Sequence, residues 1–77
     1  MTRELVNEIL NDILAKNAGN HNTLVTIMCF NGLETTSSHI NIQLEDTYVY
    51  VTDHRTYDKY ITYESISAIS AVRIEGE

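Results

Sequence analysis

The sequence predicts a mostly β domain that begins with one α-helix and continues through five strands. An apolar stripe with helical period covers about residues 3–17. Residues 23–74 are rich in β-branched and aromatic side chains, and they contain Asn31-Gly32, a strong hairpin signal. A chain of 77 residues has no room for a second core, so we expect a single domain over residues 1–77.

The N-terminal segment is predicted to form an amphipathic helix over about residues 3–17. Its apolar side chains recur on one side of a 3.6-residue period: Leu5, Val6, Ile9, Leu10, Ile13 and Leu14. Thr2 is a suitable N-cap, and Gly19 suits the position just after the helix end. We expect the stripe to cover the sheet that follows, and a helix that binds a partner or a membrane surface is the alternative.

The next segments predict a hairpin with one long arm. Thr23–Phe30 is nearly all apolar, which predicts a first strand that is covered on both faces. Asn31-Gly32 predicts a two-residue turn of type I′. A second strand follows from Leu33 to Leu44, and we expect it to bend at Ser37-Ser38, where polar residues interrupt the apolar alternation.

Three shorter strands complete the prediction, at Tyr48–Thr52, Lys59–Tyr63 and Ile66–Ile74. The polar segment Asp53–Asp58 is expected to be a loop. Apolar residues of the last strand are first three apart and then two apart, which predicts a 3₁₀ turn or a bulge near Ser67-Ala68.

Charge and composition exclude several classes of protein. The chain carries 5 Lys and Arg against 11 Asp and Glu, a net charge of −6. This acidic balance argues against non-specific electrostatic binding to nucleic acid and against binding to an anionic membrane surface. No apolar run approaches the roughly 20 residues of a membrane span, and no signal-peptide pattern is visible.

Cysteine content indicates where the protein functions and how it is stabilised. Cys29 is the one cysteine, it lies in an apolar strand, and it suits a reducing compartment, so we expect a soluble, cytoplasmic protein. So short a chain buries a modest core and usually needs a supplement. Without a disulfide or a metal cluster, oligomerisation is the expected supplement.

No motif for catalysis or cofactor binding is present. The three histidines (His21, His39 and His54) match no zinc-binding spacing. Asp53-His54 together with Asp58 is a weak candidate for a cation site on one loop. Because no nucleophile–base pair is legible either, we expect neither an enzyme nor a bound cofactor or metal.

Tyrosine is the residue type that most suggests a binding surface. The tyrosines fall in one part of the chain: Tyr48, Tyr50, Tyr57, Tyr60 and Tyr63. Stacking of a nucleic-acid base on an accessible aromatic ring contributes about 1–3 kcal/mol per base. The alternative is that these tyrosines are simply good strand formers with polar tips.

Three segments resemble the Sm-like family, which includes the bacterial host factor Hfq. Val25–Gly32 is similar to the first strand and turn of that family, a β run that ends in Asn-Gly. Leu44–Val51 resembles the corner between the second and third strands of the first Sm motif, and Ile61–Ile69 resembles the second Sm motif. The resemblance implies a five-stranded, strongly bent, small open barrel. It also implies a homo-oligomeric ring of about five to seven copies, in which the fourth strand of one copy pairs with the fifth strand of the next.

The resemblance and the tyrosines together predict a non-enzymatic ring that binds RNA or nucleotides. The expected contact residues are Asp46, Tyr48, Arg55, Lys59 and Tyr63. The apolar residues expected at the interface between copies are Ile61, Tyr63, Ile66, Ile69 and Val72.

Two departures from the family pattern support an alternative function. Ser37 and Ser38 stand in the region where the family has a glycine in its second strand. The basic pair that lines the RNA-binding pore in the family falls on Tyr63-Glu64 here. The alternative is a structural or interaction module, such as an accessory protein of a phage or mobile element, which keeps the ring without binding RNA.

Overall fold

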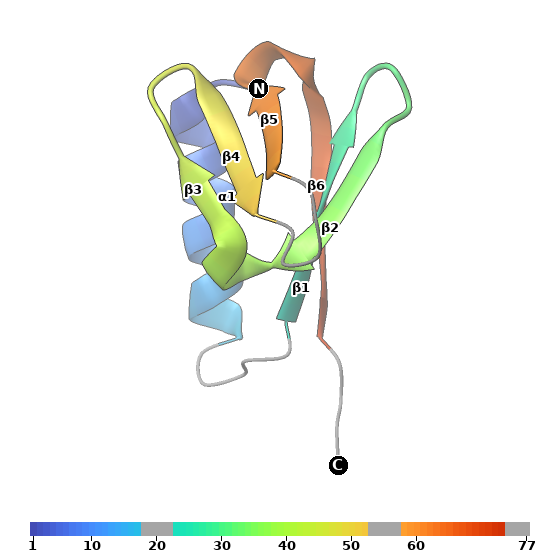
Figure 1. Ribbon diagram of the computed structural model, residues 1–77. Helices are drawn as coiled ribbons and strands as arrows, with labels where there is room; N and C mark the ends of the chain where they lie inside the picture. The colour runs from blue at the N-terminus through green and yellow to red at the C-terminus, as the bar shows by residue number, and fades with distance from the viewer. Residues whose placement is uncertain (18–22, 53–57, 74–77) are drawn as a thin grey trace.

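The computed structural model shows one helix, two three-stranded antiparallel sheets and two 3₁₀ turns (Figure 1). It describes residues 1–17, 23–52 and 58–73. In chain order the elements are α1 (Arg3–Lys16), β1 (Thr23–Cys29), β2 (Glu34–Ser38), η1 (His39–Asn41), β3 (Ile42–Leu44), β4 (Tyr48–Thr52), β5 (Asp58–Thr62), η2 (Tyr63–Ser65) and β6 (Ile66–Arg73). The predicted mostly β fold with an N-terminal helix is confirmed. Seven residues named in the sequence predictions lie outside the described residues: Gly19, His21, Asp53, His54, Arg55, Tyr57 and Ile74.

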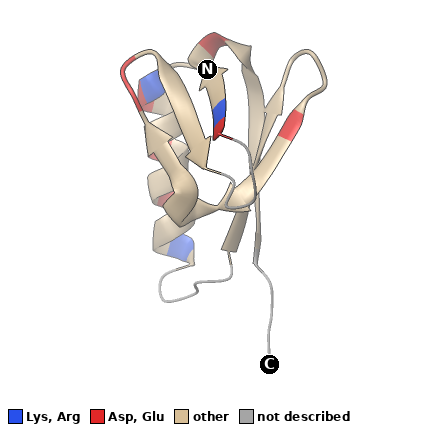
Figure 2. Cartoon of the chain, in the orientation of Figure 1, with Lys and Arg blue, Asp and Glu red and all other residues tan. Residues whose placement is uncertain are grey.

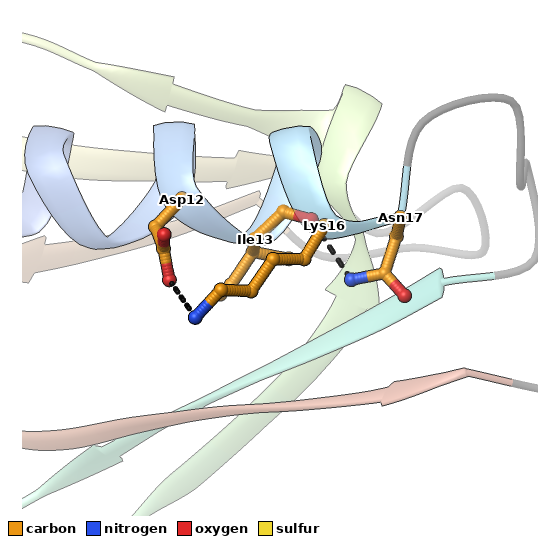
Figure 3. A network of polar contacts seen from close by, with 4 residues as sticks. All are labelled: Asp12, Ile13, Lys16 and Asn17. Carbon is orange, nitrogen blue, oxygen red and sulfur yellow. Dashed lines mark hydrogen bonds and ion pairs between the residues drawn. The ribbon is translucent and has the colours of Figure 1, made fainter.

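Both ends of α1 are fixed by side chains. The Thr2 hydroxyl accepts a hydrogen bond from the Leu5 amide at 3.1 Å, which confirms the predicted N-cap. At the other end, the Asn17 side-chain amide and backbone N–H both donate to the Ile13 carbonyl, at 2.8 and 3.1 Å (Figure 3). The Ile13 carbonyl therefore accepts the last helical hydrogen bond and a second one from the Asn17 side chain, which fixes the end of the helix.

Only part of the apolar stripe of α1 enters the core. Val6 is fully buried, and Leu10 and Ile13 pack against the core beside it. Leu5 and Leu14 remain 43% and 42% exposed. The expectation that the stripe covers the sheet is therefore confirmed for Val6, Leu10 and Ile13, whereas Leu5 and Leu14 lie at the exposed margins of the stripe.

The turn after β1 differs from the predicted type I′ turn. A type I′ turn needs positive φ at both central residues, but in the described residues only Gly32 has positive φ, at 92°. The Gly32 amide donates to the Cys29 carbonyl at 3.0 Å, and the Cys29 amide donates to the Leu33 carbonyl at 2.9 Å. This is the pattern of a three-residue loop with a glycine bulge, in which Phe30 joins the turn.

The long second strand of the prediction is divided between the two sheets. β2 pairs with β1, and β3 pairs with β4, so the sheet orders are β2-β1-β6 and β3-β4-β5. The single turn η1 begins at His39, one residue after the predicted bend at Ser37-Ser38. This division gives six strands where five were predicted.

The predicted irregularity near Ser67 is confirmed. β6 pairs with β1, and the register shifts so that Met28 lies opposite Ala68 while Cys29 lies opposite Ile66. Ser67 is the extra residue of this bulge, and its hydroxyl donates to the Met28 carbonyl at 3.1 Å.

The core lies where the inward faces of both sheets meet one turn of α1 (Figure 1). Its buried residues are Val6, Val25, Ile27, Val49, Val51, Ile61, Tyr63 and Ile66. Among the described residues, no helix is long and apolar enough to cross a membrane.

Replacement of Val6 should test how far the fold depends on the helix. Val6→Ala removes two methyl groups from a fully buried site and should lower the free energy of unfolding by about 2 kcal/mol. Leu14→Ala is the matched control, because Leu14 is 42% exposed on the same helix. Urea unfolding followed by circular dichroism measures both variants, and equal losses would contradict the described packing.

Candidate functional site

Three tyrosines lie together on the outward side of the β3-β4-β5 sheet. Val49 and Val51 of β4 are buried, so the alternating residues Tyr48 and Tyr50 point the other way. The Tyr60 ring, from β5, lies between them. Its centroid is 5.6 Å from that of Tyr48, at an interplanar angle of 60°, and 5.2 Å from that of Tyr50, at 41°. We call this cluster of Tyr48, Tyr50 and Tyr60 the tyrosine face.

The surroundings of the tyrosine face are polar and acidic. Strand register places Gln43 beside Tyr50 and Thr62 beside Tyr48. Asp58 shares the outward side, two residues before Tyr60 on β5. Across the described outward positions of this sheet there is no Lys or Arg, whereas Asp58 supplies a negative charge. In Figure 2 the ribbons of β3 and β4 carry no basic segment, and the basic segment of β5 is the inward-facing Lys59.

A pocket of about 350 Å³ lies between the β1–β2 hairpin and β5, and we call it the edge pocket. Its lining residues are Cys29, Leu33, Glu34, Thr35, Lys59, Tyr60 and Ile61. Most of this lining is apolar, but it includes one cation, Lys59, and one carboxylate, Glu34. Lys59 is in the pocket because it pairs with the buried Val51 and so points away from the tyrosine face.

Tyr63 is buried in the single chain and forms hydrogen bonds with two distant segments. Its side chain is only 8% exposed, and its hydroxyl donates to the Glu45 carbonyl at 2.6 Å. The same carbonyl accepts a hydrogen bond from Arg3 Nε at 3.1 Å. The backbone carbonyl of Tyr63 accepts from the Met1 amino group at 2.8 Å. Tyr63 therefore links the start of α1 to the β3–β4 turn, and its ring faces the core, where no base could stack on it.

The local environment changes the acidity of Tyr63. Burial removes water from the phenolate and raises the pKa of the Tyr63 hydroxyl above its usual value of 10.0. The nearby guanidinium of Arg3 acts in the opposite direction but does not cancel the effect of burial.

The predicted RNA-contact residues do not form one patch within the single chain. Asp46 is exposed in the β3–β4 turn, Tyr48 belongs to the tyrosine face and Lys59 lines the edge pocket. Tyr63 is in the core, and Arg55 lies outside the described residues. The sequence offered one signal for the actual cluster, the alternation of Tyr48 and Tyr50, but the position of Tyr60 depends on the β4–β5 register.

The predicted interface residues also separate into two groups. Ile61, Tyr63 and Ile66 are at most 9% exposed in the single chain, so their side chains are already committed to its own core. Their assignment as contacts between copies stays a prediction. Ile69 is partly buried, and Val72 is 55% exposed on β6.

The remaining candidates for chemistry do not assemble into a site. The described residues contain no group of three or more His, Cys, Asp or Glu side chains that could hold a metal ion. His39 lies in η1, and its Nδ1 atom is buried without a hydrogen-bond partner. Cys29 is a free, partly buried thiol in the edge pocket. No protein-family model, curated protein or solved structure matches the chain.

The contacts of Tyr63 predict a pH-dependent loss of stability. Tyr63→Phe should lower the free energy of unfolding by about 1 kcal/mol at neutral pH, because the Glu45 carbonyl loses the shorter of its two hydrogen bonds. Above pH 10.0 the unfolded chain releases the phenol proton before the folded chain does, so wild-type stability falls as pH rises. Tyr63→Phe lacks this group, and the difference between the two proteins should shrink.

Urea unfolding between about pH 8 and pH 11 measures this difference. Tyr60→Phe is the control, because Tyr60 is 65% exposed. A wild-type advantage that stays constant across this range would contradict the position given to Tyr63.

Proposed function

We propose that the chain is a non-enzymatic protein of the Sm-like type that assembles into a homo-oligomeric ring. One observation carries the proposal: the strands follow a single path that is open at both ends. From β6 the path runs through β1 and β2, crosses the bend at η1, and continues through β3 and β4 to β5. A strongly bent, open, small barrel has this arrangement, with β2 and β3 acting as two halves of one strand.

The two ends of this path support assembly from identical copies. Among the strands of the described residues, β5 pairs only with β4, and β6 pairs only with β1. Each therefore has a row of backbone N–H and C=O groups available for another strand. Pairing β5 of one copy with β6 of the next would satisfy both edges, and repetition of such a head-to-tail contact closes a ring.

Side chains at these edges are consistent with such pairing. Val72 is 55% exposed on β6, and Tyr60 is 65% exposed on β5. The core of the single chain has eight buried apolar residues, so added burial between copies would supplement a small core.

The ring proposal predicts a multiple of the 8.8 kDa chain mass in native mass spectrometry. Val72→Glu should reduce the assembled fraction strongly, because it places a carboxylate at the expected contact between strand edges. Ile40→Glu is the matched control, since Ile40 is 73% exposed in η1 and lies on neither edge. A monomeric, folded wild-type chain at micromolar concentration would refute the ring.

For the ligand of the ring, RNA or a nucleotide is the first candidate, and we place it at the edge pocket. Tyr60 supplies an exposed aromatic wall there, and Lys59 supplies a cation that could meet a phosphate. The pocket adjoins β5, so a ring would repeat it once in every copy. Asp46 and Tyr48 are then peripheral to the pocket, and Arg55 remains an additional predicted cation.

A second candidate is an interaction module that has the ring but binds no RNA. Glu64 is exposed in η2, and Tyr63 beside it is buried, at the two positions where the resembled family carries basic residues. A net charge of −6 in each copy would add up around a ring and repel nucleic acid.

Binding of RNA distinguishes these two candidates. We expect U-rich, A-rich or mixed oligoribonucleotides to bind at low salt in fluorescence anisotropy, and Lys59→Gln to weaken that binding several-fold. Lys16→Gln is the matched control, because it removes the same charge from an exposed position on α1, outside the pocket. Absence of binding at ~100 μM protein would refute the RNA function. In that case, gain of RNA affinity by Glu64→Lys would support the interaction module.

A further inference from the structure

We propose that the tyrosine face binds a proline-rich, positively charged peptide segment of a partner protein. This inference goes beyond the ring and its RNA ligand, although the face shares one residue, Tyr60, with the edge pocket. Its basis is an outward aromatic cluster that the fold does not use. Tyr60 is 65% exposed, and Tyr48 and Tyr50 are partly exposed, although their neighbours on the same strands fill the core.

The arrangement of the rings suits a polyproline II helix. Tyr48 and Tyr50 are two residues apart on β4, which separates their side chains by about 6.6 Å along the strand. In a polyproline II helix, residues two apart are separated by about 6.2 Å along the axis. The tilts of 60° and 41° between the rings prevent a flat surface, so the face offers ridges against which proline rings can pack.

The negative charge on the tyrosine face indicates that its ligand should be positively charged. Asp58 lies on the same side of the sheet as the rings, and the described outward positions carry no Lys or Arg. A phosphate backbone would find no cation among the described residues of this face, whereas an Arg or Lys beside the prolines could pair with Asp58 and lie over an aromatic ring. The net charge of −6 favours a basic partner in the same sense.

Hydrogen-bonding groups on the face also fit a peptide. The hydroxyl groups of Tyr48, Tyr50 and Tyr60 are available to a ligand, because all three side chains reach solvent. Gln43 and Thr62 flank the rings on the neighbouring strands. A proline-rich segment exposes carbonyl oxygens that accept such donors, and it loses little entropy on binding because it is already extended.

Titration with synthetic peptides tests the proposal. The probe is a fluorescein-labelled peptide of repeated Pro-Pro-Arg units, and anisotropy measures its binding to the full-length chain. One comparison peptide has alanine for every proline, and another has glutamate for every arginine. We expect saturable binding of the first peptide, with amide shifts in nuclear magnetic resonance spectra confined to β3, β4 and β5, and much weaker binding of the other two.

Variants of the face locate the interaction. Tyr50→Ser should weaken binding about tenfold, and Tyr50→Phe should retain most of it, because the ring is the packing surface. Asp58→Asn should weaken binding about threefold, whereas the matched change Glu64→Gln, away from the face, should have no effect. Circular dichroism melting checks that each variant is folded.

Several outcomes would overturn the proposal. They are no binding of the Pro-Pro-Arg peptide at millimolar concentration, equal binding of the alanine peptide, or shifts outside the tyrosine face. Loss of oligoribonucleotide binding in Tyr50→Ser, without peptide binding, would assign the face to nucleic acid instead. Loss of self-association in Tyr50→Ser would assign it to a second copy. Native mass spectrometry of the ring is a separate measurement, so failure of the ring leaves the peptide result interpretable.

Discussion

The structure depends on burial of apolar side chains between two sheets that could not be stable separately. A three-stranded sheet needs a covered apolar face, and each of these sheets supplies the cover for the other. Val25, Ile27 and Ile66 come from one sheet, and Val49 and Val51 come from the other. The segment from β2 to β3 passes from one sheet to the other and keeps their apolar faces together.

The same packing creates the candidate binding surface. A strand that places valine inward at every second residue must place the intervening residues outward. On β4 those residues are Tyr48 and Tyr50, and on β5 the partner is Tyr60. The alternation that builds the core therefore also produces the tyrosine face. The β4–β5 register determines which residues lie side by side on it. The edge pocket differs, because it forms between the hairpin and β5, at the border of both sheets.

Patterns local in sequence predicted the fold well. The helix and its Thr2 cap, the short strand at Tyr48–Thr52 and the bulge at Ser67 follow from spacing within about ten residues, and the structure shows each of them. The type I′ turn failed because the sequence signal Asn-Gly is shared by turns of different loop length. In this protein Phe30 belongs to the loop, and its amide donates to the Ser65 carbonyl at 3.0 Å. Ser65 is far away in the chain, so a local sequence pattern cannot predict this contact.

Burial and proximity between distant segments were the features that the sequence could not predict. Tyr63 was predicted to contact RNA and a neighbouring copy, and nothing in the sequence indicated that its ring lies in the core or that its hydroxyl donates to a carbonyl 18 residues away. Ile61 and Ile66 were expected at an interface because each lies on an edge strand, but the bend turns their side chains inward. Such outcomes depend on tertiary packing, which local periodicity does not encode.

The hydrogen bonds to the Glu45 carbonyl affect which segments of the molecule unfold together. A carbonyl oxygen has two lone pairs, and both Arg3 and Tyr63 donate to this one. This one oxygen therefore connects the first turn of the helix, the β3–β4 turn and η2 through hydrogen bonds. Separation of any one of these segments weakens the attachment of the other two. These three segments, which are distant in sequence, should exchange their amide protons as one cooperative unit. The outward side of β4 and β5 has no part in that unit, so a ligand could bind there without disturbing it.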